Sequence, residues 1–225
     1  MRISLIIPAL NEAACLGPLL NELPPGLVEQ VLVVDNGSTD DTAGVARRAG
    51  AQVSVEPRRG YGYACAAGVA ASTGEILAFM DADGSFVPAE LGTLVDPIRS
   101  GTADLVLGTR MRGGMTPGAM PPHQQAGNLL IARLVHRLYG LQLTDLGPFR
   151  AVRRDLLLAL QMREHTYGWP IEMIVKAARQ RARIIEVPVQ YRPRLAGQSK
   201  VGGTLRGTLL AGYRIMRTTL RYAIG

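Results

Sequence analysis

The sequence is poor in cysteine, aromatic residues and charge, and each shortage excludes a class of protein. Among its 225 residues are two cysteines, one tryptophan and three phenylalanines, and 19% of the residues are charged. Cys15 and Cys65 are too few for a disulfide framework or a zinc knuckle, so we expect both to be packing residues. The low charge excludes a coiled coil, and a hydrophobic share of 47% excludes a disordered chain.

Long apolar runs are missing as well. The longest uncharged run, residues 113–132, contains Pro117, Pro121 and Pro122 and therefore does not resemble a membrane span. The N-terminal apolar run stops at Pro8 without a small-residue cleavage site, which is typical of a buried first strand and not of a signal peptide. We therefore expect a cytoplasmic protein that is soluble or peripheral at the inner face of the membrane.

Basic side chains, by contrast, are in excess. The chain has 25 lysines and arginines against 18 acidic residues, which gives a net charge of +7 at pH 7. This surplus favours an anionic partner, and charge alone leaves a phosphate compound, an anionic lipid and a nucleic acid open. The length suits one α/β domain with a full core.

In the first half of the chain, short β-branched runs alternate with helical patterns, as in parallel strands joined by helices. The strands expected there are residues 3–8, 30–35, 51–56, 76–81 and 104–108. Further along we expect a mobile loop at 110–122, strands at 149–152 and 183–191, and helices at 88–100, 125–139, 155–162, from Pro170, and at 204–223. The predicted fold is an open, mostly parallel α/β sheet flanked by helices, which binds ligands beyond the carboxyl ends of its strands.

Two aspartates mark the end of the fourth expected strand. Asp81 and Asp83 are separated by the small Ala82, and the alternation of an extended chain would point both carboxylates the same way. Paired carboxylates with open coordination positions suit Mg²⁺ or Mn²⁺ bridged to a diphosphate. The same residues are good turn formers, so a simple turn fits this triplet about as well.

Polar residues also follow the first two strands. Asn11 and Glu12 follow the first, and Asp35 ends the second, where an acid can accept hydrogen bonds from a ribose or a base. Asp40 and Asp41 are expected to cap the next helix.

A small-residue segment at positions 58–68 carries two arginines and the glycines Gly60 and Gly62 at an expected helix start. Small residues there allow the backbone to approach a phosphate closely. The glycine spacing misses the dinucleotide-binding fingerprint, and the sequence has no Walker lysine. Both points argue against hydride transfer and ATP hydrolysis.

Together these motifs resemble the family 2 glycosyltransferases of GT-A fold. The resemblance begins with residues 6–12 (IIPALNE), 34–42 (VDNGSTDDT) and 81–83 (DAD). Downstream the chain is similar to the branch with dolichol-phosphate and polyprenyl-phosphate mannosyl- and glucosyltransferases. The motifs that carry this are residues 108–110 (GTR), 145–150 (DLGPFR), 169–173 (WPIEM), 186–188 (EVP) and 197–200 (GQSK).

The resemblance implies an inverting, metal-dependent transfer of glucose or mannose from a UDP- or GDP-linked sugar to a polyprenyl phosphate at the cytoplasmic membrane face. It assigns the Mg²⁺ or Mn²⁺ to Asp81 and Asp83 and the acceptor phosphate to Arg110 and Lys200. Nucleotide-sugar binding is implied for Pro8, Leu10, Asn11, Glu12, Asp35, Gly60, Gly62 and Ala82. It also implies one domain, 1–225, with a nucleotide-sugar-binding half 1–110, an acceptor half 111–203 and an amphipathic helix 204–225, and no nucleic-acid partner.

Two positions depart from the family pattern. Asn36 stands where the family often has a second acid, and Ser85 stands where mannosyltransferases commonly have glutamine. A hydroxyl acceptor, lipid or soluble, and a non-catalytic nucleotide-sugar-binding homologue therefore stay open as alternatives. A hydroxyl would need a general base, for which Glu172 and Asp145 are the candidates, although holding a loop suits Glu172 better.

The last expected helix has two arcs of side chains. Arg206, Arg214, Arg217 and Arg221 share one arc, and Leu205, Leu209, Tyr213, Met216 and Leu220 share the next. The pattern fits a helix in the membrane interface with arginines on anionic headgroups, and equally one that packs its leucines on the sheet. Arg112 and Arg194, in earlier loops, fit solvated surface charges.

Overall fold

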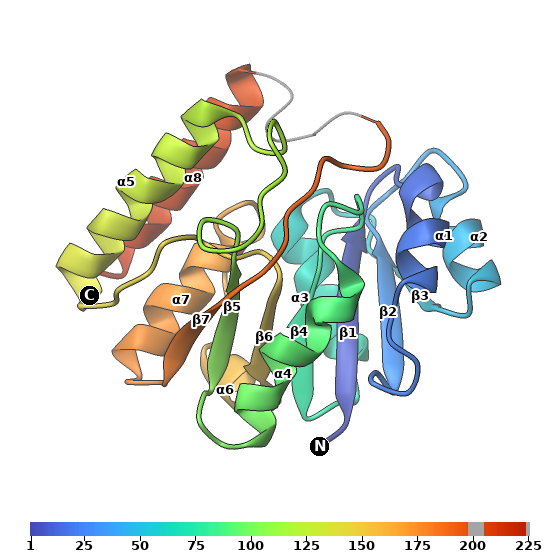
Figure 1. Ribbon diagram of the computed structural model, residues 1–225, viewed down its shortest axis with the longest axis horizontal. Coiled ribbons are helices and arrows are strands. Elements are labelled where there is room, and N and C mark those ends of the chain that lie inside the picture. Colours follow the sequence, from blue (N-terminus) through green and yellow to red (C-terminus); the bar gives the residue numbers. More distant parts are fainter. Residues whose placement is uncertain (198–204, 224–225) are drawn as a thin grey trace.

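A seven-stranded sheet forms the centre of the protein (Figure 1). The computed structural model describes residues 1–197 and 205–223, with the side chains of the last helix described from Leu210 onward. The strands are β1 (Ile3–Ala9), β2 (Gln30–Asp35), β3 (Gln52–Val55), β4 (Ile76–Phe79), β5 (Leu105–Thr109), β6 (Arg150–Arg153) and β7 (Ile184–Pro188). Their order is β3-β2-β1-β4-β6-β5-β7, and β6 alone among them runs antiparallel to its neighbours.

Helices cover both faces of this sheet. They are α1 (Ala13–Asn21), α2 (Thr42–Arg48), α3 (Tyr61–Ala71), α4 (Leu91–Arg99) after the 3-10 turn Pro88–Glu90, α5 (Pro122–Tyr139), α6 (Arg154–Ala159), α7 (Trp169–Arg179) and α8 (Leu205–Arg221). One hydrophobic cluster joins the sheet to α1, α2 and α4, and a second joins it to α3, α5, α6, α7 and α8.

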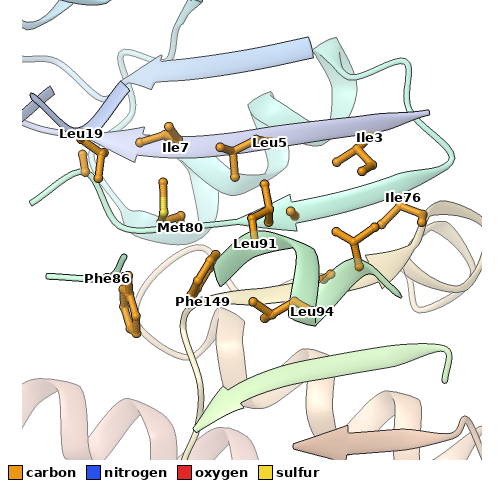
Figure 2. Packing of buried hydrophobic residues seen from close by; sticks show 14 of the residues in the cluster. Ile3, Leu5, Ile7, Leu19, Ile76, Met80, Phe86, Leu91, Leu94 and Phe149 are labelled. Carbon is orange, nitrogen blue, oxygen red and sulfur yellow. The ribbon is translucent and has the colours of Figure 1, made fainter. Parts of the chain in front are cut away.

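Strand alternation divides the core between the two faces. Ile3, Leu5 and Ile7 of β1 enter the first cluster beside Leu91 of α4 (Figure 2), whereas Ile6 enters the second. A parallel strand buried on both faces in this way reads as a continuous apolar run, as β1 does. Cys15 and Cys65 are both buried and unpaired, which confirms that they are packing residues.

The expected fold class is confirmed. The structure differs from the expectation in where some strands and helices begin or end. β4 ends at Phe79, so Asp81 and Asp83 lie in a turn, and the argument from strand alternation was wrong for them. β7 is shorter than expected and ends at Pro188, although the N–H of Val189 still donates to the carbonyl of Thr109 at 3.1 Å. α5 begins at Pro122, three residues before the expected start, with proline in its first turn.

α5 and α8 lie side by side at one end of the molecule (Figure 1). Tyr139 of α5 donates a hydrogen bond to the carbonyl of Thr219 in α8 at 2.6 Å. The described side chains that pack inward here are Ala211, Ile215, Met216, Thr218 and Thr219 of α8, and Tyr222 just after it. Of the expected apolar arc, Met216 packs inward, whereas Tyr213 and Leu220 are exposed by 61% and 41%. The side chains of Leu205 and Leu209 lie outside the described residues. None of the described helices is long and apolar enough to cross a membrane.

Candidate active site

The carboxyl ends of β1, β2 and β4 meet at one edge of the sheet because these strands are parallel neighbours. Pro8 and Ala9 of β1 lie opposite Val34 and Asp35 of β2. The expected ligand residues brought to this edge are Pro8, Leu10, Asn11, Glu12, Asp35, Asp81, Ala82 and Asp83. The fold therefore assembles most of the predicted donor site from three separate parts of the chain.

The acidic pair stands in the turn after β4. Asp83 accepts a hydrogen bond from the backbone N–H of Ser85 at 3.0 Å, so the turn interpretation also holds. Burial, and next the charge of Asp83, raise the pKa of Asp81 to about 7, against the opposing effect of Arg110 and Arg150. The pair thus carries a repulsion that a divalent cation would relieve.

The donor atoms at this turn fit Mg²⁺ or Mn²⁺. Both are hard cations that take oxygen ligands and retain positions for water and phosphate oxygens. In the described part of the chain no three or more His, Cys, Asp or Glu side chains form a metal-binding group, so Asp81 and Asp83 are a two-carboxylate set. The hydroxyl of Ser85, two residues after Asp83, is buried and interacts with the side chain of Tyr191.

Arg194 bridges two acids of the site and was missed by the sequence analysis. Its guanidinium donates to both carboxylate oxygens of Glu12, at 2.9 and 3.0 Å, and lies 3.7 Å from Oδ2 of Asp83. The next backbone N–H, of Leu195, donates to the carbonyl of Asp83 at 2.9 Å. With 19% of its side chain exposed, Arg194 is not the solvated loop charge that we expected. Its signal in the sequence was only its position just before the GQSK motif.

The turns after β1 and β2 hold each other in place. Asn11, at φ 52°, accepts a hydrogen bond from the N–H of Thr39 at 2.7 Å. Asp35 accepts one from the N–H of Ser38 at 3.0 Å. Asp40 accepts from the N–H groups of Thr42 and Ala13, which confirms its capping role and extends it to α1. Asp41 pairs with Arg48 at 2.7 Å instead of capping with its side chain.

Asn36 has a structural role that explains its departure from the family pattern. Its side-chain NH₂ donates to the carbonyls of Glu56 at 2.9 Å and Arg58 at 2.7 Å. Its side-chain oxygen accepts from the N–H of Gly60 at 2.9 Å. A carboxylate could not donate to those two carbonyls, so this loop requires the amide.

Gly60 and Gly62 make room for the protein's own backbone. A Cβ at position 60 would lie 2.4 Å from the carbonyl oxygen of His165, and one at position 62 would lie 2.3 Å from that of Glu164. Tyr63 stacks on the His165 ring with centroids 4.2 Å apart. The close approach that we expected here toward a phosphate is thus made by residues 164–165, which the sequence could not place.

Arg110, the residue after β5, forms a buried ion pair with Asp145. Its Nε donates to Asp145 at 2.7 Å, and the Asp145 carboxylate is fully buried. Burial raises the pKa of Asp145, but the charge of Arg110 and the hydrogen bonds from Arg110 and the Leu146 N–H together outweigh burial, and the pKa is lowered overall. Asp145 is therefore held ionised by its partner, and Arg110 is a fixed charge, not a free one on a mobile loop.

Arg150 is a second buried cation that sequence reasoning left without a role. It lies on β6, 1% exposed, and donates to the carbonyls of Leu146, Gly147 and Pro170. Burial lowers the pKa of Arg150 to about 10, so it stays charged near neutral pH. Its sequence signal was a lone charge between the apolar Phe149 and Ala151.

Glu172 is fully buried on α7 and occupied by four donors. It accepts from the N–H groups of Arg163 and Glu164, from Tyr222 Oη at 2.6 Å and from Lys176 Nζ at 2.8 Å. These contacts favour the loop-holding role over that of a general base. The predicted acceptor residue Lys200 lies outside the described residues.

Comparison with known proteins agrees with this geometry. Residues 4–160 match the sequence model of glycosyl transferase family 2. An uncharacterized glycosyltransferase of Mycobacterium tuberculosis is 42% identical over 210 residues, which cover 93% of this chain and 94% of that protein. The undecaprenyl-phosphate mannosyltransferase of Micrococcus luteus is 35% identical over 92% of this chain and 90% of its own length.

A solved structure carries the same fold with ligands bound. The glucosyl-3-phosphoglycerate synthase of Mycobacterium tuberculosis, in complex with Mn²⁺, UDP-glucose and phosphoglyceric acid, has a TM-score of 0.77 and 26% identity. The match covers 99% of this chain and 79% of that one. The same synthase has also been crystallised with Mg²⁺ and UDP. Sequence model, relatives and fold agree, and the chain is a glycosyltransferase that belongs to family 2 and has the GT-A fold.

Proposed function

We propose that this glycosyltransferase moves a hexose, glucose or mannose, from a UDP- or GDP-linked sugar to a polyprenyl phosphate, with inversion, at the cytoplasmic face of the membrane. The relative from Micrococcus luteus, similar along 92% of this chain, is named for a mannosyl transfer to undecaprenyl phosphate. The acidic pair at the sheet edge supports a nucleotide diphosphate donor, because its donor atoms fit a cation that also binds phosphate oxygens.

The residues at the sheet edge that would bind the nucleotide-sugar donor can be assigned roles from their charge and hydrogen bonds. Asp81 and Asp83 would hold the Mg²⁺ or Mn²⁺, which offsets the charge of the departing diphosphate. Asp35 and Asn11, fixed by the N–H groups of Ser38 and Thr39, would orient the nucleoside. Direct displacement then needs an acceptor held in line with the leaving group, so positioning is the main task of the other residues.

The main support for a phosphate acceptor is that both candidate bases, Asp145 and Glu172, are already bound by other groups of the protein. Asp145 is held ionised by Arg110, and Glu172 is saturated by four donors. Both carboxylates have a lowered pKa and are occupied by donors, so each is a weak proton acceptor. This suits an acceptor that is already anionic near neutral pH. A polyprenyl phosphate is such an acceptor, and Lys200 and Arg110 would supply positive charge toward it.

A hydroxyl acceptor on a phosphorylated small molecule is the second candidate. It is favoured by the solved structures of similar fold, which contain phosphoglyceric acid beside UDP-glucose. That acceptor shares an anionic group with polyprenyl phosphate, so the same cations would serve. The two candidates differ in whether the new bond forms at a phosphate or at a hydroxyl oxygen.

A donor and acceptor panel tests the proposal. Purified protein with Mn²⁺ is incubated with UDP-glucose or GDP-mannose and with either a short polyprenyl phosphate or 3-phosphoglycerate, and both phases are analysed by mass spectrometry. A hexosyl polyprenyl phosphate is expected, absent when EDTA is added or when Asp83→Asn replaces the wild type. Soluble glycoside with no lipid product would favour the second candidate, and no product from any combination would overturn both.

A further inference from the structure

A pocket lies between the second half of α8 and the segment that precedes α7. Its lining residues are Arg163, Glu164, Arg214, Arg217, Thr218, Arg221 and Tyr222. Four of these seven are arginines, and one is acidic. The residues assigned to donor, metal and acceptor are not among them, so this pocket has no role in the transfer proposed above.

Of the four arginines at this pocket, Arg214 is half-buried and the other three are exposed, and none of them forms an ion pair within the described residues. Several half-buried arginines elsewhere differ in this respect. Arg110, Arg192 and Arg194 each form an ion pair with a carboxylate. In the ranges that the structure describes, the guanidinium groups of Arg163, Arg214 and Arg217 form no ion pair or hydrogen bond. Gathered cations repel one another, and an anion between them removes that cost.

Neighbouring contacts fix the frame of the pocket. Glu172 holds the backbone N–H groups of Arg163 and Glu164, and the same carboxylate accepts from Tyr222 Oη. A Cβ on Gly168 would lie 2.7 Å from Oγ1 of Thr218, so the turn before α7 packs directly on α8. The two sides of the pocket are therefore held at a fixed separation, which is what a preorganised anion site requires.

We propose that this arginine pocket binds the phosphate group of an anionic ligand. Guanidinium groups match phosphate geometry with paired N–H donors, and Thr218 adds a hydroxyl at the wall. The phosphate belongs either to a lipid headgroup or to a soluble phosphate compound. On α8, Arg217 is flanked at i−4 and i+3 by the exposed Tyr213 and Leu220, and such a stripe places a lipid headgroup within reach.

Calorimetric titration with inorganic phosphate tests the site. Ionic strength is kept constant with chloride, and no donor, acceptor or metal is present, so failure here is distinct from failure of the transferase proposal. Wild type is expected to bind phosphate saturably. The double variant Arg163→Gln/Arg217→Gln is expected to bind at least about tenfold more weakly, because two of the guanidinium groups that would donate to the phosphate are removed.

The matched control is Arg133→Gln/Arg137→Gln, which removes the same charge from exposed positions on α5 that do not line the pocket. It is expected to bind phosphate as the wild type does. Equal weakening in both double variants would mean general charge attraction and would overturn the proposal. So would the absence of saturable binding to wild type. Thermal melting confirms that both variants fold.

Two further arms identify the source of the phosphate. Vesicles of phosphatidylcholine with phosphatidylglycerol are compared with vesicles of phosphatidylcholine alone, and soluble glycerol phosphate is added as competitor. If wild type binds the anionic vesicles and glycerol phosphate releases it, the pocket holds a lipid headgroup. If phosphate binds but vesicles do not, the pocket serves a soluble phosphate compound, and the lipid source is rejected.

Discussion

In the proposed metal site, Asp83 supplies one of the two carboxylate charges. Asp83→Asn keeps the acceptor for the N–H of Ser85 but removes the negative charge. We expect the fold to persist and the affinity for Mn²⁺ with UDP to fall by at least about a hundredfold, because one of only two carboxylate ligands becomes neutral. Calorimetry with both ligands measures this. Asp96→Asn, an exposed change on α4, is the control, and unchanged affinity in Asp83→Asn would reject the assignment.

Arg194 competes with a cation for the same acids. Its guanidinium lies 3.7 Å from Asp83 and donates to Glu12, so it supplies part of the positive charge that a metal would bring. With Arg194→Gln we expect Mn²⁺ alone to bind about fivefold more tightly, since a unit charge at this distance is worth about 1 kcal/mol in a wet site. The control, Arg192→Gln, removes a charge from the same segment, where it pairs with Glu22. Equal or weaker Mn²⁺ binding in Arg194→Gln would contradict the competition.

Asn36 offers a test of why this chain departs from its family. Asn36→Asp would set carboxylate oxygens against the carbonyls of Glu56 and Arg58 in a buried place. We expect a loss of about 3 kcal/mol in the free energy of unfolding. Urea denaturation measures it, with Asn21→Asp on the exposed end of α1 as the matched addition of charge. A stability equal to that of the control would show that the loop does not depend on the amide.

At the scale of elements, α7 is tied to the segment before it and to α8 through Glu172. Burial raises the pKa of Glu172, yet Lys176, Tyr222 and two backbone N–H groups outweigh it, and the pKa is lowered overall. A carboxylate with a lowered pKa stabilises the fold above its unfolded pKa, and that contribution is lost as the pH falls through the folded value.

Glu172→Gln is therefore expected to cost about 3 kcal/mol of unfolding free energy at pH 7, because it leaves Lys176 without its partner. The difference from wild type should shrink below about pH 4, where the wild-type carboxyl becomes protonated. Urea denaturation at pH 7 and at low pH measures both. Asp96→Asn should change stability little at pH 7. A difference that is the same at both pH values would mean that the effect is not electrostatic.

Element by element, local patterns predicted most strands and helices, and the misses come from contacts between distant residues. The apolar runs of β1, β2 and β5 were sufficient to predict these strands, because each strand is buried on both faces. The packing of residues 164–165 against Gly60 and Gly62 joins segments about a hundred residues apart, and no local pattern encodes it. The same holds for Arg194, whose partner Glu12 lies near the other end of the chain.

At the scale of the whole molecule, the expected nucleotide-sugar and acceptor halves share one sheet. β6 and β7 come from the second half, yet β6 pairs with both β4 and β5 of the first. This insertion brings the buried Arg150 close enough to oppose part of the rise in the pKa of Asp81. The charge of Asp81, which we propose as a metal ligand, is thus influenced by a residue from the second half of the chain, a relation that only the assembled sheet provides.

Among the described residues, six of the ten exposed large apolar side chains lie on α5 and α8, the helix pair at one end of the molecule in Figure 1. Leu129, Leu130 and Leu138 are exposed on α5, as are Leu210, Tyr213 and Leu220 on α8. Neither helix contains an acidic residue, so every charged side chain on them is an arginine. This combination of apolar and basic side chains suits the surface of an anionic membrane.

We therefore expect the protein to sediment with vesicles that contain phosphatidylglycerol at low salt, less so at high salt because the arginine contribution is screened. Tyr213→Ser/Leu220→Ser should weaken this binding at least about tenfold, since two side chains no longer enter the apolar layer. The matched control is Val55→Ser/Leu158→Ser, which changes equally exposed apolar residues on β3 and α6. If the control variant also loses vesicle binding, α8 does not make the attachment. If the wild type never binds vesicles, a lipid acceptor must reach the site without the α5 and α8 surface.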